Sequence, residues 1–116
     1  MLRFLIAALF VGHGLVHGIM FGLTYSPQAV ADLPFNPSRS WLLGETRTLG
    51  FVSALVVTLA FIVAGAGYGW RASWWPQLTI VAAVLSTALL LAYFSRWWTV
   101  GLLINIGLVA LALRDM

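Results

Sequence analysis

The segment Phe10–Leu23, FVGHGLVHGIMFGL, lies inside the first long apolar run of the chain and carries both of its histidines. The whole run, Phe4 to Leu23, has 20 residues. At about 1.5 Å per residue, a helix of this length crosses a hydrocarbon core of about 30 Å. We therefore predict a membrane-spanning helix in which His13 and His17 lie one turn apart at bilayer depth, where ionisable side chains are rare and usually functional.

The composition of the whole chain favours the same class of protein. The 116 residues are 62% hydrophobic and 8% charged, whereas a soluble domain carries about 25% charged residues. The mean hydropathy is +1.01. A water-soluble domain of this size cannot bury so much apolar surface, so we predict an integral membrane protein embedded in the lipid bilayer. Because cysteine is absent, the chain has neither disulfides nor thiolate metal sites.

The positive charge is spread along the chain rather than clustered. The net charge of +3 comes from six arginines, which stand singly at positions 3, 39, 47, 71, 96 and 114. Scattered arginines do not form the basic patch of a nucleic-acid-binding protein, so we expect no nucleic acid partner. They are typical of residues that flank membrane spans. The all-arginine usage also suggests a bacterial source.

Four apolar runs predict an all-α, integral membrane four-helix bundle that forms a single domain over residues 1–116. The predicted helices cover about 3–23, 38–67, 76–95 and 98–113, with an outer loop at about 24–40. Prolines 27, 34 and 37 exclude a helix through the loop, and Asn36-Pro37-Ser38 is typical of a helix start. Four spans place the N and C termini on the same side. That side collects Arg3, Arg71, Arg114 and the terminal amine, whereas the arginines of the other side, 39, 47 and 96, are offset by Asp32 and Glu45. The small excess of positive charge favours cytoplasmic termini in a bacterial inner membrane.

A second interpretation of the N-terminal run is a signal peptide. Arg3 precedes the apolar stretch, and Ala29-Val30-Ala31 resembles a cleavage site. The apolar stretch is long for a signal peptide, however, and it is interrupted by two histidines. We therefore expect it to remain in the protein as the first span.

The polar residues of the predicted helices gather in the half of the membrane that faces the long loop. Counting from the helix ends places His13, Ser86, Thr87 and Asn105 near the midplane, His17 about one turn further out, and Glu45 and Arg47 near the loop surface. A charged group inside a bilayer costs about 2.5–3.5 kcal/mol. Glu45 and Arg47 are two residues apart and point in opposite directions on a helix. We therefore expect one of them to meet His17.

This cluster gives the first hypothesis for function. We predict a non-catalytic membrane protein that binds a small hydrophobic ligand or a partner subunit through His13, His17, Glu45, Arg47 and Asn105. The imidazoles would form hydrogen bonds, and Arg47 would hold an anionic or carbonyl group. Because so small a chain has little interior, we expect a homo-oligomer or a subunit of a larger membrane complex.

Two other hypotheses stay open. The i, i+4 spacing of His13 and His17 suits two metal ligands on one helix, which would make the protein a redox component that binds haem or a divalent metal. The same spacing is also that of a polar stripe packed against a neighbouring helix. Because the chain offers few further ligands, we predict no cofactor and keep haem or a divalent metal as an alternative.

The third hypothesis is a dimeric small transporter that uses Glu45. No nucleophile elbow, phosphate loop or dinucleotide motif indicates an enzyme.

Small residues indicate close helix packing. Gly14, Gly18 and Gly22 repeat the GxxxG spacing that lets membrane helices approach each other, toward a helix of the same chain or of another. Gly101 shares a helix face with Asn105, which we expect to form a hydrogen bond between helices worth about 1 kcal/mol. The six tryptophans lie near the ends of the predicted spans, as interfacial belt residues do.

Several short motifs occur in a recognisable order. They are His13-Gly14-Leu15-Val16-His17, Trp41 with Gly44, Arg47, and Trp74-Trp75. This order resembles a group of small bacterial membrane proteins with four spans, and the architecture is more loosely similar to that of DoxX-like membrane proteins. The resemblance implies the four-helix topology and indicates that these positions belong together, but it implies no activity.

Overall fold

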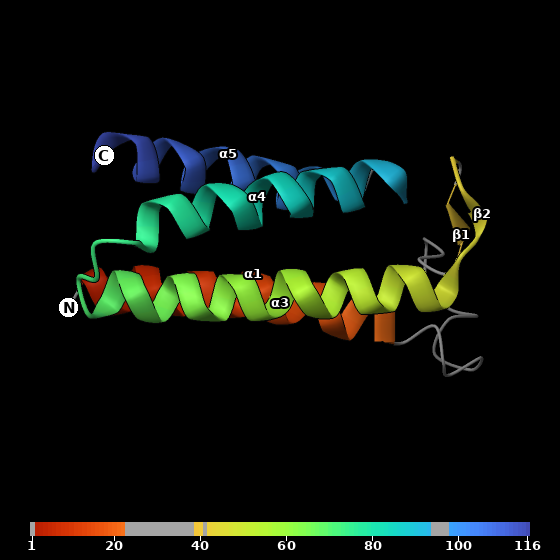
Figure 1. Ribbon diagram of the computed structural model, residues 1–116, viewed down its shortest axis with the longest axis horizontal. Coiled ribbons are helices and arrows are strands. Elements are labelled where there is room, and N and C mark those ends of the chain that lie inside the picture. Colours follow the sequence, from red (N-terminus) through yellow and green to blue (C-terminus); the bar gives the residue numbers. More distant parts are fainter. Residues whose placement is uncertain (1, 23–38, 41, 94–97) are drawn as a thin grey trace.

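The computed structural model describes residues 2–22, 39–40, 42–93 and 98–116, without the side chains of residues 39, 45 and 47. Within these residues four helices lie along the long axis: α1 (Leu2–Gly22), α3 (Arg47–Gly69), α4 (Trp75–Ala92) and α5 (Thr99–Arg114). Successive helices alternate in direction, so the start of α1 and the end of α5 lie at the same end of the bundle (Figure 1). The predicted all-α four-helix bundle is confirmed.

The helices have the length and surface of membrane spans. Among the described residues, α1, α4 and the part of α3 from Thr48 to Gly69 are long and apolar enough to cross a membrane, whereas α5 is a shorter apolar helix of 16 residues. Large apolar side chains point outward from all four helices; Leu5, Leu59, Val84 and Leu103 are each at least 60% exposed. Such a surface requires a lipid environment, which makes the chain a membrane protein.

The second helix begins later than the sequence predicts. The expected start near residue 38 is wrong, because α3 begins at Arg47. The preceding residues form two short antiparallel strands, β1 (Arg39–Ser40) and β2 (Gly44–Glu45). The Ser40 hydroxyl accepts hydrogen bonds from two backbone N–H groups of the connecting turn and donates one to the last carbonyl of α4. Gly44 has φ +81°, in the left-handed region that interrupts a helix. The predicted outer loop, about 24–40, lies outside the described residues except for its last two residues, which form β1.

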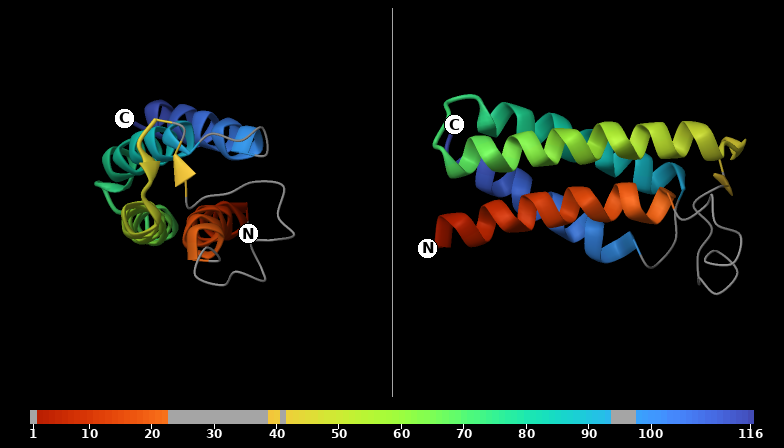
Figure 2. Two further views of the ribbon diagram at one scale, coloured as in Figure 1. Left: turned by 90° about the vertical axis from the view of Figure 1, so that its right-hand side faces the viewer. Right: turned by 90° about the horizontal axis from the view of Figure 1, so that it is seen from below.

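The helices pack in chain order around the bundle. α1 lies along α3, α3 packs on α4, and α4 packs on α5 (Figure 2). The core at the end near the termini is aromatic: the Phe10 ring stacks on Tyr68 at 5.7 Å and meets Trp75 edge to face at 6.3 Å. Trp75 is 4% exposed, so it belongs to the core and not to an interfacial belt. α1 and α5 pack less closely than these three pairs.

Glycines bring α1 close to α3. A Cβ atom on Gly14 would lie 2.8 Å from the Phe61 Cβ and 3.0 Å from the Thr58 carbonyl oxygen, and one on Gly18 would lie 3.0 Å from the Thr58 hydroxyl. That hydroxyl donates a hydrogen bond to the Gly14 carbonyl (2.6 Å) and accepts one from the Gly18 N–H (3.1 Å). Gly22 packs in the same way against the next turns of α3. The helix that meets these glycines therefore belongs to the same chain.

Candidate functional site

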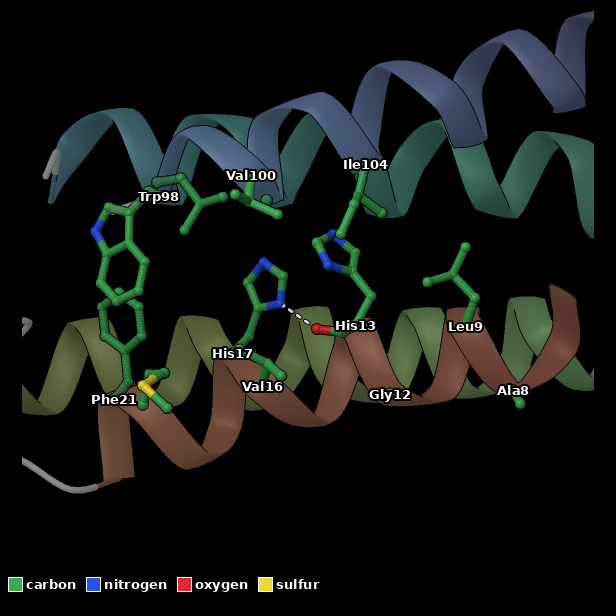
Figure 3. Close-up of a pocket in the computed structure, with 13 residues that line it drawn as sticks. Ala8, Leu9, Gly12, His13, Val16, His17, Phe21, Trp98, Val100 and Ile104 are labelled. Carbon is green, nitrogen blue, oxygen red and sulfur yellow. Dashed lines mark hydrogen bonds between the residues drawn. The ribbon is translucent and has the colours of Figure 1, made fainter. Parts of the chain in front are cut away.

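The two histidines point from α1 toward α4 and α5 (Figure 3). The His13 Nε2 lies 2.7 Å from the Asn105 Oδ1 on α5, and the His17 Nε2 lies 2.6 Å from the Ser86 Oγ on α4. The His17 Nδ1 lies 2.8 Å from the backbone oxygen of His13. Their side chains are buried, with 6% and 4% exposure. Three of the four imidazole nitrogens therefore have a partner within the described residues.

Asn105 joins the two histidine contacts into one network. Its Nδ2 donates hydrogen bonds to the Ser86 Oγ at 2.9 Å and to the Thr87 Oγ1 at 3.2 Å. Asn105 and Ser86 are buried. A buried polar group away from water is costly unless it is hydrogen-bonded. The network therefore ties α1, α4 and α5 together at one level of the bundle.

A pocket of about 640 Å³ lies between α1 and α5, beside this network. Most of its wall is apolar, and its lining includes Leu9, Val16, Val100 and Ile104 together with His13 and His17 (Figure 3). The pocket thus combines an apolar wall with two imidazoles.

An aromatic pair lies at the end of the pocket where α1 ends and α5 begins. The Phe21 and Trp98 rings stack with centroids 6.3 Å apart, and both line the pocket (Figure 3). The Trp98 indole N–H donates a hydrogen bond to the Tyr93 carbonyl at 2.8 Å. Trp98 is therefore held in place as part of the pocket wall and is 8% exposed, which differs from the prediction of an interfacial belt residue.

Two glycines border the pocket with different surroundings. A Cβ atom on Gly12 would have no heavy atom within 4 Å, so this residue leaves open space beside His13. A Cβ atom on Gly101 would lie 3.2 Å from the Leu90 Cδ1 and 3.7 Å from the His13 Cε1. Gly101 thus allows α5 to approach α4 and the His13 ring, whereas Gly12 lines the pocket without such a contact.

Glu45 and Arg47 belong to the predicted cluster, but their side chains lie outside the described part of the structure. Arg47 is the first residue of α3. Thr58, which contacts α1 at Gly18, follows eleven residues later, about 16 Å further along the helix. The described hydrogen-bond partners of His17 are Ser86 and the His13 carbonyl. The expected contact of His17 with Glu45 or Arg47 stays a prediction.

The rings of His13 and His17, the two predicted metal ligands, meet edge to face, with centroids 4.8 Å apart and planes at 84°. Their Nε2 atoms are directed at different side chains. Within the described residues, no group of three His, Cys, Asp or Glu side chains is placed to hold a metal ion. The use of these histidines as metal or haem ligands stays a prediction.

Two residues of the site were not singled out from the sequence. Thr58 supplies the hydroxyl between α1 and α3, and the Phe61 ring lies 4.9 Å from the His13 ring and 5.9 Å from the His17 ring. Thr58 had a usable signal, since it is an isolated hydroxyl in an apolar run. Phe61 had none, because a phenylalanine in a membrane span is ordinary.

The fold and the site define a four-helix membrane protein with a buried polar network beside an apolar pocket. No protein-family model, curated protein or solved structure matches the chain.

Proposed function

We propose that this protein is a non-catalytic membrane protein that binds a small hydrophobic ligand in the pocket between α1 and α5. The observation that carries the proposal is a cavity of about 640 Å³ with a mostly apolar wall and two buried histidines in that wall. Ligand pockets in proteins usually measure about 300–1,000 Å³ and combine apolar lining with a few placed polar groups. The pocket therefore has the size and chemistry of a ligand site.

The position of the pocket supports entry of the ligand from the bilayer. α1 and α5 are the first and last helices, and they pack less closely than α1 with α3, α3 with α4, or α4 with α5. Large apolar side chains surround the bundle, so lipid borders the space between these two helices. A ligand that partitions into the bilayer reaches the pocket without crossing water.

We further propose a bacterial inner membrane with both termini in the cytoplasm. Arg3, Arg71 and Arg114 lie at the end of the bundle that holds the termini. The other three arginines, at positions 39, 47 and 96, belong in the sequence to the segments at or between the opposite helix ends, which also contain Asp32 and Glu45. The small excess of positive charge at the end with the termini is what cytoplasmic ends of spans carry. The outward apolar faces also support assembly as a homo-oligomer or as a subunit of a larger membrane complex.

Photolabelling tests the pocket directly. The purified protein in lipid nanodiscs is exposed to an alkylbenzene with a twelve-carbon, diazirine-bearing tail, irradiated, and digested for peptide mass spectrometry. We expect saturable labelling of lining residues such as Leu9, Val16 and Ile104. Labelling that does not saturate, or that is spread evenly over lipid-facing residues, contradicts the proposal.

A matched pair of variants sharpens this test. Gly12→Leu adds a side chain at a lining position of the pocket, where a Cβ meets no atom within 4 Å, and should weaken the saturable labelling. Gly107→Leu adds the same side chain at another position with open space, outside the pocket lining, and should leave labelling unchanged. Equal labelling of the two variants would show that the probe binds elsewhere.

A further inference from the structure

The contacts of His17 determine which of its ring nitrogens carries a hydrogen. Its Nδ1 faces the His13 carbonyl oxygen, which only accepts hydrogen bonds, so the Nδ1 carries a hydrogen. Among the described residues no acidic side chain contacts either histidine, and an unpaired charge away from water is costly. His17 is therefore neutral and has a lone pair on Nε2. The Ser86 hydroxyl, 2.6 Å away, donates its hydrogen to that lone pair.

The remaining hydrogens follow from this first step. The Ser86 hydroxyl has one hydrogen, which His17 receives, so Ser86 can only accept from Asn105. The amide group of Asn105 that faces Ser86 must then be its NH₂, as the 2.9 Å contact from Nδ2 shows. This turns the Asn105 oxygen toward the His13 Nε2 at 2.7 Å, so the His13 Nε2 carries a hydrogen.

The four hydrogen bonds close a loop that runs from the His13 ring through Asn105, Ser86 and His17 back to the His13 carbonyl. The loop holds the two histidines in opposite tautomers, with hydrogen on Nε2 of His13 and on Nδ1 of His17. The Asn105 amide oxygen accepts a hydrogen bond but does not take up the proton and pass another one on, so it cannot relay a proton between the two imidazoles. Asn105 therefore acts as a positioning residue that fixes the His13 tautomer.

One acceptor is left over. The His13 Nδ1 carries a lone pair in this tautomer and has no hydrogen-bond partner among the described residues. His13 lines the pocket. The pocket therefore presents a fixed hydrogen-bond acceptor within an otherwise apolar wall.

Building on the proposed pocket, we propose that its ligand is an apolar molecule with a hydroxyl group, a phenol or an alcohol, that donates a hydrogen bond to the His13 Nδ1. A molecule with only acceptors, such as an ether, ester or ketone, would face the lone pair without a hydrogen to offer. A carboxylate would face it with a negative charge. The site thus selects for a donor on a hydrophobic body, because a polar group buried without a partner costs binding free energy.

A pair of probes that differ in one hydrogen-bond donor tests this selection. 4-Dodecylphenol and its methyl ether compete with the diazirine probe for the native protein in nanodiscs, with concentrations corrected for partition into the lipid. We expect the phenol to bind about tenfold more tightly, as one additional hydrogen bond to a buried acceptor predicts. In His13→Phe both compounds should still compete, with a ratio near one, while Gly107→Leu should keep the native ratio.

The outcomes separate this inference from the proposed function. Equal affinities in the native protein, or tighter binding of the ether, overturn the hydroxyl selection and leave the pocket intact. Competition by neither compound overturns both. A native preference that persists in His13→Phe rules out His13 as the acceptor. If that variant does not fold, ¹⁵N-histidine NMR of the native protein decides: the phenol should shift the His13 Nδ1 signal and the ether should not.

Discussion

A methyl group added at Gly14 should destabilise the bundle far more than one added at Gly12, two residues earlier on the same helix. At Gly14 the new Cβ would lie 2.8 Å from the Phe61 Cβ and 3.0 Å from the Thr58 carbonyl oxygen, whereas at Gly12 it meets nothing within 4 Å. The gain in helix propensity from glycine to alanine is about 1 kcal/mol at both positions and cancels in the comparison. Overpacking costs about 1–3 kcal/mol, so Gly14→Ala should be less stable than Gly12→Ala by roughly that amount.

Reversible unfolding in mixed micelles measures this difference. The two variants and the native protein are titrated with sodium dodecyl sulfate and followed by tryptophan fluorescence and circular dichroism. We expect Gly12→Ala to unfold at or above the native midpoint and Gly14→Ala to unfold well below it. If the two variants unfold at the same point, α1 does not pack on α3 through Gly14, and the assignment of the glycine face to this helix pair is refuted.

Two further predictions concern the polar contacts and use the same titration. Ser86→Ala removes the hydrogen bonds to His17 and Asn105, and because hydrogen bonds between membrane helices average about 0.6 kcal/mol each, we expect a loss of about 1–2 kcal/mol; an unchanged midpoint would mean that the network does not hold the helices. Thr58→Val keeps the side-chain shape and removes the hydroxyl that contacts α1, so it should cost about 1 kcal/mol, while Thr58→Ser should be near native. Equal stability of the two Thr58 variants would contradict a role for the hydroxyl.

The helices follow from the sequence because each is a long apolar run bounded by polar, proline or aromatic residues. The start of α3 at Arg47 does not follow in this way. It depends on the Ser40 hydroxyl, whose partner is the last carbonyl of α4, and on the left-handed backbone of Gly44. Contacts between residues that are far apart in the sequence precede this helix start, and no local pattern reveals them.

The candidate site also has one part that the sequence indicates and another part that only the structure shows. His13, His17 and Asn105 attract attention in the sequence because polar side chains are costly in a membrane, and they lie in one network in the structure. Which partner each one meets depends on the rotation and register of neighbouring helices. The contact of His17 with Ser86 of α4, for example, is not indicated by any local pattern in the sequence. Trp98 has the residue type and the position, near the end of a span, of an interfacial belt residue. Only its packing on Phe21 shows that it belongs to the pocket wall.

The most direct test of the account is the tautomeric state of the two histidines in the native protein. Because the chain contains two histidines, ¹⁵N-histidine labelling and solid-state NMR in lipid bilayers give one set of ring signals for each. The hydrogen-bonded loop predicts opposite neutral tautomers, with hydrogen on Nε2 of His13 and on Nδ1 of His17. The same tautomer at both residues, or a charged ring at either, would contradict the loop and with it the fixed acceptor that the pocket offers to its ligand.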